Sequence, residues 1–470
     1  MTHKIWLRAL CSALFITTIT LFQSCTKDEI GPVEDKTLDY EHAENRWIFD
    51  QMKHWYLWSD SIPQYFSKTH YTKTADEYFE SLLYKRNDTY GDRFSYIEKK
   101  SSAQSKASLP VKTGFGFEFK YLRSTLHAGG NDPVKIYLYV VYYVYPNSPA
   151  DKAGLKRGDL IYKVNGEYIN DMNALNSKTS ITVKLANFEN FYLVFRESDP
   201  TRDITIGEYT DSPILEDLIL SNDSKKVGYL CYKTFAEGSD QYLIEAFKRY
   251  KAEGVSELIL DLRYNPGGRL SVAQTLGGLI IPTDKLGQNY IIQEPNQTLK
   301  NSSEVNLTLK TPKTQAIIDA NLGLERLYVL TGIGTASASE TTILCTKPYV
   351  KNVYVIGSTT KGKNQSSVEL TNAKYDWALN PIIARLYNCN NETFKETGII
   401  PNYEINEDKV FPYKPLGDPN EPLLNAALYH ISNGEFPDGT KSSSEHSLGE
   451  FTIVNLGEGG NRLTLDDLKK

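Results

Sequence analysis

The second half of the chain alternates short apolar runs with segments in which apolar residues recur every three or four positions. The apolar runs predict β-strands at 227–232, 258–262, 326–330, 353–356 and 382–387. The periodic segments predict helices at 240–253 and 270–280, and a further helix that begins near Ser339. Strands that alternate with helices are typical of an α/β domain. We therefore predict an α/β domain over residues 206–432.

The region before this domain shows two other patterns. Residues 44–58 place several aromatic side chains at spacings that suit one face of a helix, which predicts a small helical segment within 26–108. Further on, glycine alternates with phenylalanine at 114–117, and 135–145 is rich in β-branched and aromatic residues. Such runs predict strands, so we expect a β-rich domain over 109–205.

Two further stretches have no clear periodicity. The serine-rich stretch 101–108 is polar enough to be a linker. Residues 283–321 are polar and their secondary structure is ambiguous from the sequence. The last segment, 433–470, is expected to be a carboxy-terminal tail.

The first 25 residues resemble an export signal. Lys4 and Arg8 precede an apolar run at 9–22, which is too short to cross a bilayer core of about 30 Å but suits a signal peptide. Ser24 precedes Cys25 as in bacterial lipoprotein processing sites, where the cysteine is acylated. A plain secretory peptide cleaved nearby is the alternative. In the first case we expect a lipid anchor on Cys25 and a location in the cell envelope, at the periplasmic or surface face of an outer membrane.

Composition limits the classes of partner. The chain has 470 residues, 40% of them hydrophobic, with 32 Tyr and 18 Phe, which predicts a folded protein of several domains. Its net charge of −6 lacks the basic excess that nucleic acid binding requires, so no nucleic acid partner is expected. After removal of Cys11 and acylation of Cys25, three cysteines would remain, without the spacing of a zinc site. No metal is expected, and Cys231 and Cys345 are expected to be small core residues.

The positions of the histidines bear on catalysis. The seven histidines stand at 3, 42, 54, 70, 127, 430 and 446, and none falls between 226 and 387. A nucleophile in that interval is therefore expected to use another base. The motifs HExxH and GxSxG are also absent, which disfavours zinc peptidase and α/β-hydrolase chemistry.

A run of small residues at 331–340 follows a predicted strand and precedes a predicted helix. Such a turn leaves N–H groups unpaired at the start of the helix, where they can stabilise an oxyanion beside a hydroxyl group. Ser337 and Ser339 both lie there. The alternative is that the small residues only allow the helix to pack closely.

A second glycine-containing turn, 357–363, has the spacing of a nucleotide-binding P-loop. A P-loop needs Ser or Thr after its lysine and a helix behind it, whereas Asn364 and a predicted strand follow Lys363 here. No nucleotide or other cofactor is therefore expected. A lysine in such a turn can instead be desolvated, which lowers its pKa and lets it accept a proton.

Four stretches together resemble one family. They are SPADKAGLKRGDLIYKVNG at 148–166, which resembles a PDZ domain, LDLRYNPGG at 260–268, GTASASE at 334–340 and GSTTKGK at 357–363. In this order they resemble the tail-specific, or C-terminal processing, serine peptidases over about 113–432. The resemblance implies a crotonase/ClpP-like α/β catalytic core, preceded by a small helical segment and a β-rich PDZ-like domain.

The resemblance also implies roles for individual residues. Ser337 would be the nucleophile, with Ser339 as its rival, and Lys363 the general base. The oxyanion hole would consist of the N–H groups of Gly268, or else Gly267, and Ala338. The PDZ-like domain would bind a substrate C-terminus or an extended segment through a loop formed by Gly114, Phe115, Gly116 and Phe117.

Two features depart from the family pattern. The interval from Ser337 to Lys363 is one residue longer than usual, and Ser367 replaces the glutamine expected four positions after the lysine. Gln365 is a candidate for the role of orienting the lysine. The expected activity is endopeptidase cleavage of protein or peptide substrates. The alternatives are an inactive peptide-binding lipoprotein on the same scaffold and, more remotely, a glycan-binding surface protein.

Overall fold

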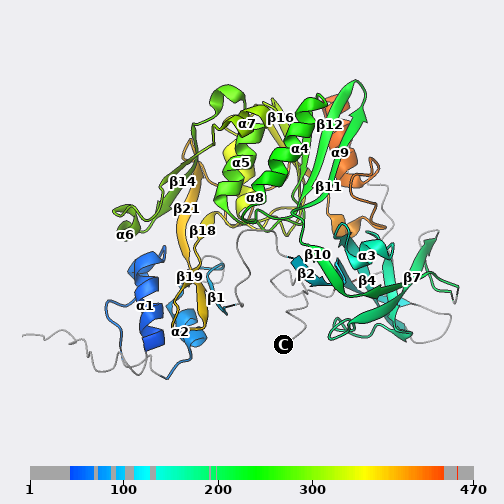
Figure 1. Ribbon diagram of the computed structural model, residues 1–470, viewed down its shortest axis with the longest axis horizontal. Coiled ribbons are helices and arrows are strands. Elements are labelled where there is room, and N and C mark those ends of the chain that lie inside the picture. Colours follow the sequence, from blue (N-terminus) through cyan, green and yellow to red (C-terminus); the bar gives the residue numbers. More distant parts are fainter. Residues whose placement is uncertain are drawn as a thin grey trace, which may run out of the picture.

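The computed structural model describes residues 43–67, 72–85, 91–100, 111–126, 134–189, 192–196, 198–438 and 452–453. Figure 1 shows three regions: an α/β core at the top, a helical amino-terminal region at the lower left and a β-rich domain at the lower right. Within these residues, no helix has the length and apolar character needed to span a membrane.

The core contains a six-stranded sheet in the order β11-β12-β13-β16-β17-β22. Only β11 is antiparallel to its neighbour; the remaining strands run parallel. The strand bounds are Ile214–Asn222 (β11), Lys225–Tyr232 (β12), Glu257–Asp261 (β13), Arg326–Thr331 (β16), Asn352–Gly357 (β17) and Tyr403–Glu404 (β22). The central strands are buried on both faces, as their continuous apolar runs require.

Helices cover both faces of this sheet (Figure 1). In β13, Leu258 and Leu260 pack into the hydrophobic cluster that includes the helices of one face. Ile259 packs into the cluster that includes helix α9 (Pro422–Asn433) on the other face. The first face carries α4 (Asp240–Ala252), α5 (Leu270–Ile280), α7 (Gln315–Ala320) and α8 (Ala338–Thr346), and the second carries α9. Alternate side chains of each strand thus supply two separate cores.

The amino-terminal region is joined to the core by two smaller sheets. Its helices are α1 (Ala43–Trp55) and α2 (Ala75–Leu82), and its strand β1 (Tyr96–Lys99) pairs with β20 (Trp377–Asn380), which also pairs with β19 (Leu370–Thr371). The second sheet has the order β15-β14-β21-β18, formed by Thr308–Lys310, Asn289–Pro295, Ile382–Asn388 and Gln365–Ser367. Helix α1 ends at Trp55, three residues earlier than predicted. Beyond it, the Leu57 N–H donates a hydrogen bond to the Ile382 carbonyl at 2.8 Å.

The β-rich domain is built on the order β23-β3-β4-β5-β7-β8. The bounds are Thr452–Ile453 (β23), Phe117–Leu126 (β3), Val134–Val144 (β4), Leu160–Val164 (β5), Ser180–Glu189 (β7) and Tyr192–Val194 (β8). A separate two-stranded sheet pairs β2 (Val111–Gly114) with β10 (Gly207–Thr210), and a short helix, α3 (Pro149–Lys152), follows β4. Strand β23 comes from the carboxy-terminal tail and adds to β3 antiparallel, with Thr452 opposite Arg123.

The predicted fold class is confirmed: a mixed α/β core follows a small helical segment and a β-rich PDZ-like domain. Helix α5 has the predicted bounds, and the predicted core strands are each found within two residues of their ends. The ambiguous stretch 283–321 contains β14, β15, α7 and a short helix, α6 (Gln297–Lys300). The domain boundaries stay predictions, and the signal segment 1–25 and linker 101–108 lie outside the described residues.

Candidate active site

Three loops meet at the carboxyl edge of the parallel strands. Because β13, β16 and β17 run parallel, the segments that follow them leave the sheet at the same edge. The Ala336 N–H donates a hydrogen bond to the Asn265 carbonyl at 3.2 Å, and the Lys361 N–H donates one to the Thr335 carbonyl at 2.9 Å. These bonds bring the predicted site residues Gly268, Ser337 and Lys363 to one edge of the core.

Ser337 lies in the turn between β16 and α8 with an unusual backbone conformation. Its φ is 56° and its ψ is −116°, a region that residues with a side chain rarely adopt. The turn is closed by Gly267, where an added Cβ would lie 2.7 Å from the Ser337 Cβ. The close approach of a glycine therefore allows the strained turn, and it leaves Ser337 partly exposed.

The rival serine has a different environment. Ser339 is fully buried in α8, and its hydroxyl donates to the Asn265 carbonyl at 3.0 Å. A hydroxyl that is buried and already bonded is poorly placed to attack a substrate. Ser337 is the better candidate of the two.

Asn265 determines which glycine N–H can face an oxyanion. Its side-chain oxygen accepts the Gly267 N–H at 2.9 Å, so that donor is occupied. In the described part of the chain, no hydrogen bond uses the Gly268 N–H or the Ala338 N–H. Gly268 has a φ of +142°, and an added Cβ would lie 2.4 Å from the Phe235 carbonyl oxygen. The geometry favours Gly268 over Gly267 as the partner of Ala338.

Glu340 is a site residue to which the sequence analysis gave no role. It is fully buried, and one carboxylate oxygen accepts both the Ser337 N–H and the Lys363 N–H, each at 2.8 Å. The other oxygen accepts the Gly362 N–H at 2.7 Å and the Thr360 hydroxyl. Burial raises the pKa of Glu340, while these hydrogen bonds act in the opposite direction. One buried carboxyl group thus ties the serine turn to the lysine loop.

A sequence signal for Glu340 did exist. Ser337 and Glu340 are three residues apart at the start of α8 and form a capping box. The pattern S-x-x-E predicts a helix start, but it does not show that the carboxylate also reaches a second loop.

Lys363 is half-buried beside this carboxylate. Burial lowers the pKa of Lys363, whereas the negative charges of Asp92 and Glu340 act to raise it. Among the described residues, no ion pair involves the Lys363 amine, and no hydrogen bond joins it to the Ser337 hydroxyl. Gln365 is buried, but its side-chain oxygen has no hydrogen-bond partner and its amide is not bonded to Lys363.

The described histidines and buried cysteines have other environments. His54 pairs with Glu304 at 2.8 Å, and His430 on α9 bonds to the Tyr328 hydroxyl at 2.9 Å. Burial raises the pKa of the Cys231 and Cys345 thiols well above the ordinary value, as expected for small core residues. None of these groups contacts the Ser337 turn through a hydrogen bond.

Comparison with known proteins identifies the family. The model of peptidase family S41 matches residues 226–405, the model of the S41 N-terminal domain matches 43–96, and a PDZ domain model matches 140–177. The chain therefore carries the catalytic region and the N-terminal domain of peptidase family S41. It is a serine-type peptidase, and the matched S41 region contains all three loops of the candidate site.

Individual relatives agree with this assignment. The chain is 26% identical over 388 residues to the carboxy-terminal processing protease CtpA of Bacillus subtilis (strain 168), covering 79% of this chain and 73% of CtpA. A CtpA-like serine protease of Staphylococcus aureus (strain bovine RF122 / ET3-1) is 26% identical over 233 residues, covering 46% of this chain and 40% of the relative. The crystal structure of an S41 protease from Bacteroides fragilis NCTC 9343 aligns with a TM-score of 0.68 and 27% identity, covering 83% and 97% of the two chains.

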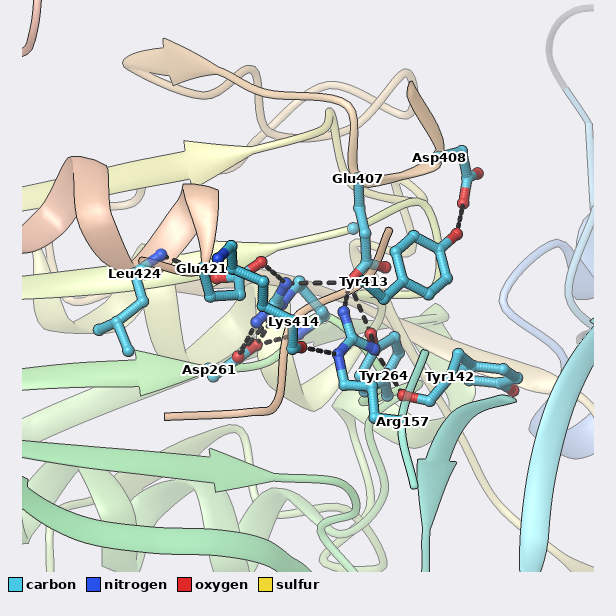
Figure 2. A network of polar contacts seen from close by, with 12 residues as sticks. Tyr142, Arg157, Asp261, Tyr264, Glu407, Asp408, Tyr413, Lys414, Glu421 and Leu424 are labelled. Carbon is cyan, nitrogen blue, oxygen red and sulfur yellow. Dashed lines mark hydrogen bonds and ion pairs between the residues drawn. The ribbon is translucent and has the colours of Figure 1, made fainter. Parts of the chain in front are cut away.

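A cluster of largely buried charges lies at the start of the loop that contains Asn265 and Gly268 (Figure 2). Arg263, two residues before Asn265, bonds to Asp261, to Glu407 at 2.9 Å and to Glu421 at 2.7 Å. Although burial alone would raise the pKa of Glu407, the adjacent arginines hold it well below its ordinary value. This cluster could not be predicted from the sequence, because its members come from distant parts of the chain.

The cluster also includes a residue of the PDZ-like domain. Arg157 bonds to Glu407 at 2.6 Å, to the Lys414 carbonyl at 2.8 Å and to the Tyr264 hydroxyl, as Figure 2 shows. Tyr264 directly precedes Asn265. The PDZ-like domain is thereby connected to the loop that contains Asn265 and Gly268 through largely buried side chains.

The predicted peptide-binding loop lies between β2 and β3. Phe115 and Phe117 are buried in the core of the PDZ-like domain, and Gly116 has a φ of +81° where an added Cβ would lie 2.2 Å from the Ser148 Cβ. The Ser148 hydroxyl donates a hydrogen bond to the Gly116 carbonyl at 2.9 Å. In the described residues the N–H groups of Phe115 and Gly116 have no hydrogen-bond partner.

Proposed function

We propose that this S41 peptidase is an endopeptidase in which Ser337 is the nucleophile and Lys363 the general base. The observation that carries the proposal is the position of Glu340, whose single carboxylate oxygen binds the backbone N–H groups of both residues. Because the two segments share this acceptor, the serine turn and the lysine loop are held side by side.

The roles follow from the environment of each group. Lys363 in its neutral form takes the proton of the Ser337 hydroxyl, which then attacks the peptide carbonyl and forms an acyl-enzyme. The tetrahedral oxyanion accepts hydrogen bonds from Gly268 and Ala338, whose N–H groups are free for that purpose. The protonated lysine returns its proton to the leaving amine, and water completes the hydrolysis.

Replacing Lys363 by Met is expected to lower the rate at which a fluorophosphonate probe labels Ser337 by about 10³-fold, the scale of general-base catalysis. In the unchanged protein, the labelling rate should rise with pH and level off below the ordinary pKa of lysine, because burial lowers the pKa of Lys363. Lys361→Met is the matched control, since this exposed side chain lies two residues away. Equal labelling of the Lys363→Met variant would remove Lys363 from the mechanism.

The PDZ-like domain is proposed to bind a substrate C-terminus or an extended segment. Two features support this: the N–H groups of Phe115 and Gly116 are free to receive a carboxylate, and the outer edge of β3 accepts β23 in antiparallel register. CtpA of Bacillus subtilis is named as a carboxy-terminal processing protease, which is in keeping with recognition of chain ends.

We also propose that the chain is exported and anchored by a lipid on Cys25. The support is the basic and apolar pattern of residues 1–25, which lie outside the described residues. Cys25→Ser is expected to move the protein from the membrane to the soluble fraction of a bacterial host, as measured by fractionation and by loss of radiolabelled palmitate. Membrane association of the variant equal to that of the parent would exclude the lipid anchor.

A further inference from the structure

A turn from the amino-terminal region lies against the proposed general base. The Lys363 amine is 5.6 Å from the centroid of the Phe94 ring. Phe94 belongs to a segment that precedes the PDZ-like domain, whereas Lys363 follows the last long strand of the core sheet. The proposed base is therefore bordered by a part of the chain that lies far from the three loops of the site in sequence.

Asp92 fixes the conformation of this turn. One of its carboxylate oxygens accepts the N–H groups of Phe94 and Ser95, each at 2.9 Å, and the other accepts the Tyr56 hydroxyl at 2.8 Å. An aspartate that binds the two N–H groups following it closes a tight local turn. The position of the Phe94 ring is thus set by hydrogen bonds and not by packing alone.

The same turn is attached to the catalytic domain on both sides of Phe94. Arg93 donates to the Glu396 carbonyl at 2.7 Å, and the Ser95 hydroxyl accepts the Ile382 N–H at 2.8 Å. The Glu396 carbonyl also supports the lysine loop, since an added Cβ on Gly362 would lie 1.9 Å from it. The neighbours of Phe94 and Lys363 in sequence, Arg93 and Gly362, therefore contact the same carbonyl group.

A ring beside an amine has two opposing effects. By excluding water it disfavours the charged amine, whereas the ring face attracts a cation at this distance. The charged groups that act on Lys363 are Asp92 from the turn and Glu340 from α8, and both favour the protonated form. Burial outweighs them, which indicates that exclusion of water is the larger effect.

We infer that Phe94 is a positioning residue that keeps water away from the Lys363 amine, so that the amino-terminal region completes the active site. Asp92 holds the ring in place and partly offsets its effect through its own charge. The inference rests on the proposed role of Lys363 as the base.

The first experiment measures fluorophosphonate labelling of the full chain as a function of pH. Phe94→Ala admits water and should move the rise in labelling to higher pH by at least about half a unit. Phe94→Leu keeps an apolar side chain of similar length and should leave the rise within about 0.2 units of its original pH. A shift to lower pH, or an equal shift for Phe94→Leu, would overturn the inference, and so would a Phe94→Ala profile that is unchanged both here and in the acetylation experiment below.

The Asp92→Asn variant tests the inference even if Phe94→Ala does not fold. The asparagine oxygen can still accept the Phe94 and Ser95 N–H groups, but the negative charge is lost. The rise in labelling should then move to lower pH, opposite to the effect of Phe94→Ala. Tyr56→Phe is the matched control: it removes one hydrogen bond to Asp92 but keeps the charge, and should not move the profile. A shift of Asp92→Asn to higher pH, or none, would count against the inference.

A second readout separates this inference from the proposed function. In the inactive Ser337→Ala background, the pH dependence of Lys363 acetylation by acetic anhydride, followed by mass spectrometry, reports the amine directly. If Phe94→Ala moves the acetylation profile but not the labelling profile, the shielding by Phe94 holds and Lys363 is not the base. If Lys363→Met abolishes labelling while Phe94→Ala moves neither profile, the base is correct and the shielding is wrong.

Discussion

Ser337→Ala is expected to reduce peptide hydrolysis by about 10⁴-fold or more and to abolish fluorophosphonate labelling. The expected loss is this large because the acyl-enzyme can no longer form, and the remaining oxyanion donors can assist only direct attack of water on the peptide carbonyl. Hydrolysis is measured with labelled casein and labelling with a fluorescent fluorophosphonate, both on the full chain. The melting temperature should fall by only a few degrees, because Ser337 is partly exposed and the change removes the capping hydroxyl of α8, a loss of about 1 kcal/mol.

Ser339→Ala is the matched control for this prediction. Its buried hydroxyl donates to the Asn265 carbonyl, so the variant should lose about 1 kcal/mol of stability and still be labelled. Loss of labelling in Ser339→Ala together with full labelling of Ser337→Ala would reverse the assignment of the nucleophile.

Arg263→Met should cause the largest loss of stability among the changes considered. The side chain is almost fully buried between Asp261, Glu407 and Glu421. Its removal leaves these carboxylates without a positive charge that offsets the cost of burying them. Breaking a buried ion pair by removing one partner costs about 3–5 kcal/mol. For a catalytic domain of this size the melting temperature should fall by roughly 10 °C, as measured by differential scanning fluorimetry.

An exposed ion pair gives the comparison. Lys248 and Glu245 form a bridge of 3.0 Å on the surface of α4 with both side chains largely in solvent, so Lys248→Met should change stability by less than about 0.5 kcal/mol. If Arg263→Met melts at the temperature of the parent, the buried cluster does not stabilise the fold. A loss of activity in that case would mean that Arg263 acts only on the loop that contains Asn265 and Gly268.

The core of the fold could be predicted because its strands carry their own signal. The strands β12, β13 and β16 are buried on both faces and therefore appear as continuous apolar runs, and α5 follows the Asn-Pro-Gly-Gly turn directly. The stretch 283–321 could not be predicted, because β15 has only three residues and depends on β14, which itself pairs with β21 far along the chain. Pairing at that separation leaves no periodicity in a local window.

The candidate site was predictable to the same limited extent. Ser337 and Lys363 stand in short motifs after strands, which local sequence shows. Glu340 was overlooked because its second partner, the lysine loop, is distant in sequence. The positions of Asp92 and Phe94 depend on docking of the amino-terminal region, and an Asp-Arg-Phe-Ser turn has no local feature that indicates a neighbouring lysine.

The pairing of β1 with β20 has a consequence for the order of folding. Tyr96 lies opposite Asn380, so the sheet that fixes the amino-terminal region cannot form until most of the chain has been synthesised. Contacts between residues so far apart in sequence form slowly and late. A nascent chain that ends before β20 would already contain Ser337 and Lys363, but it would lack the strand against which the Phe94 turn is docked. The peptidase site is therefore among the last parts of the molecule to mature.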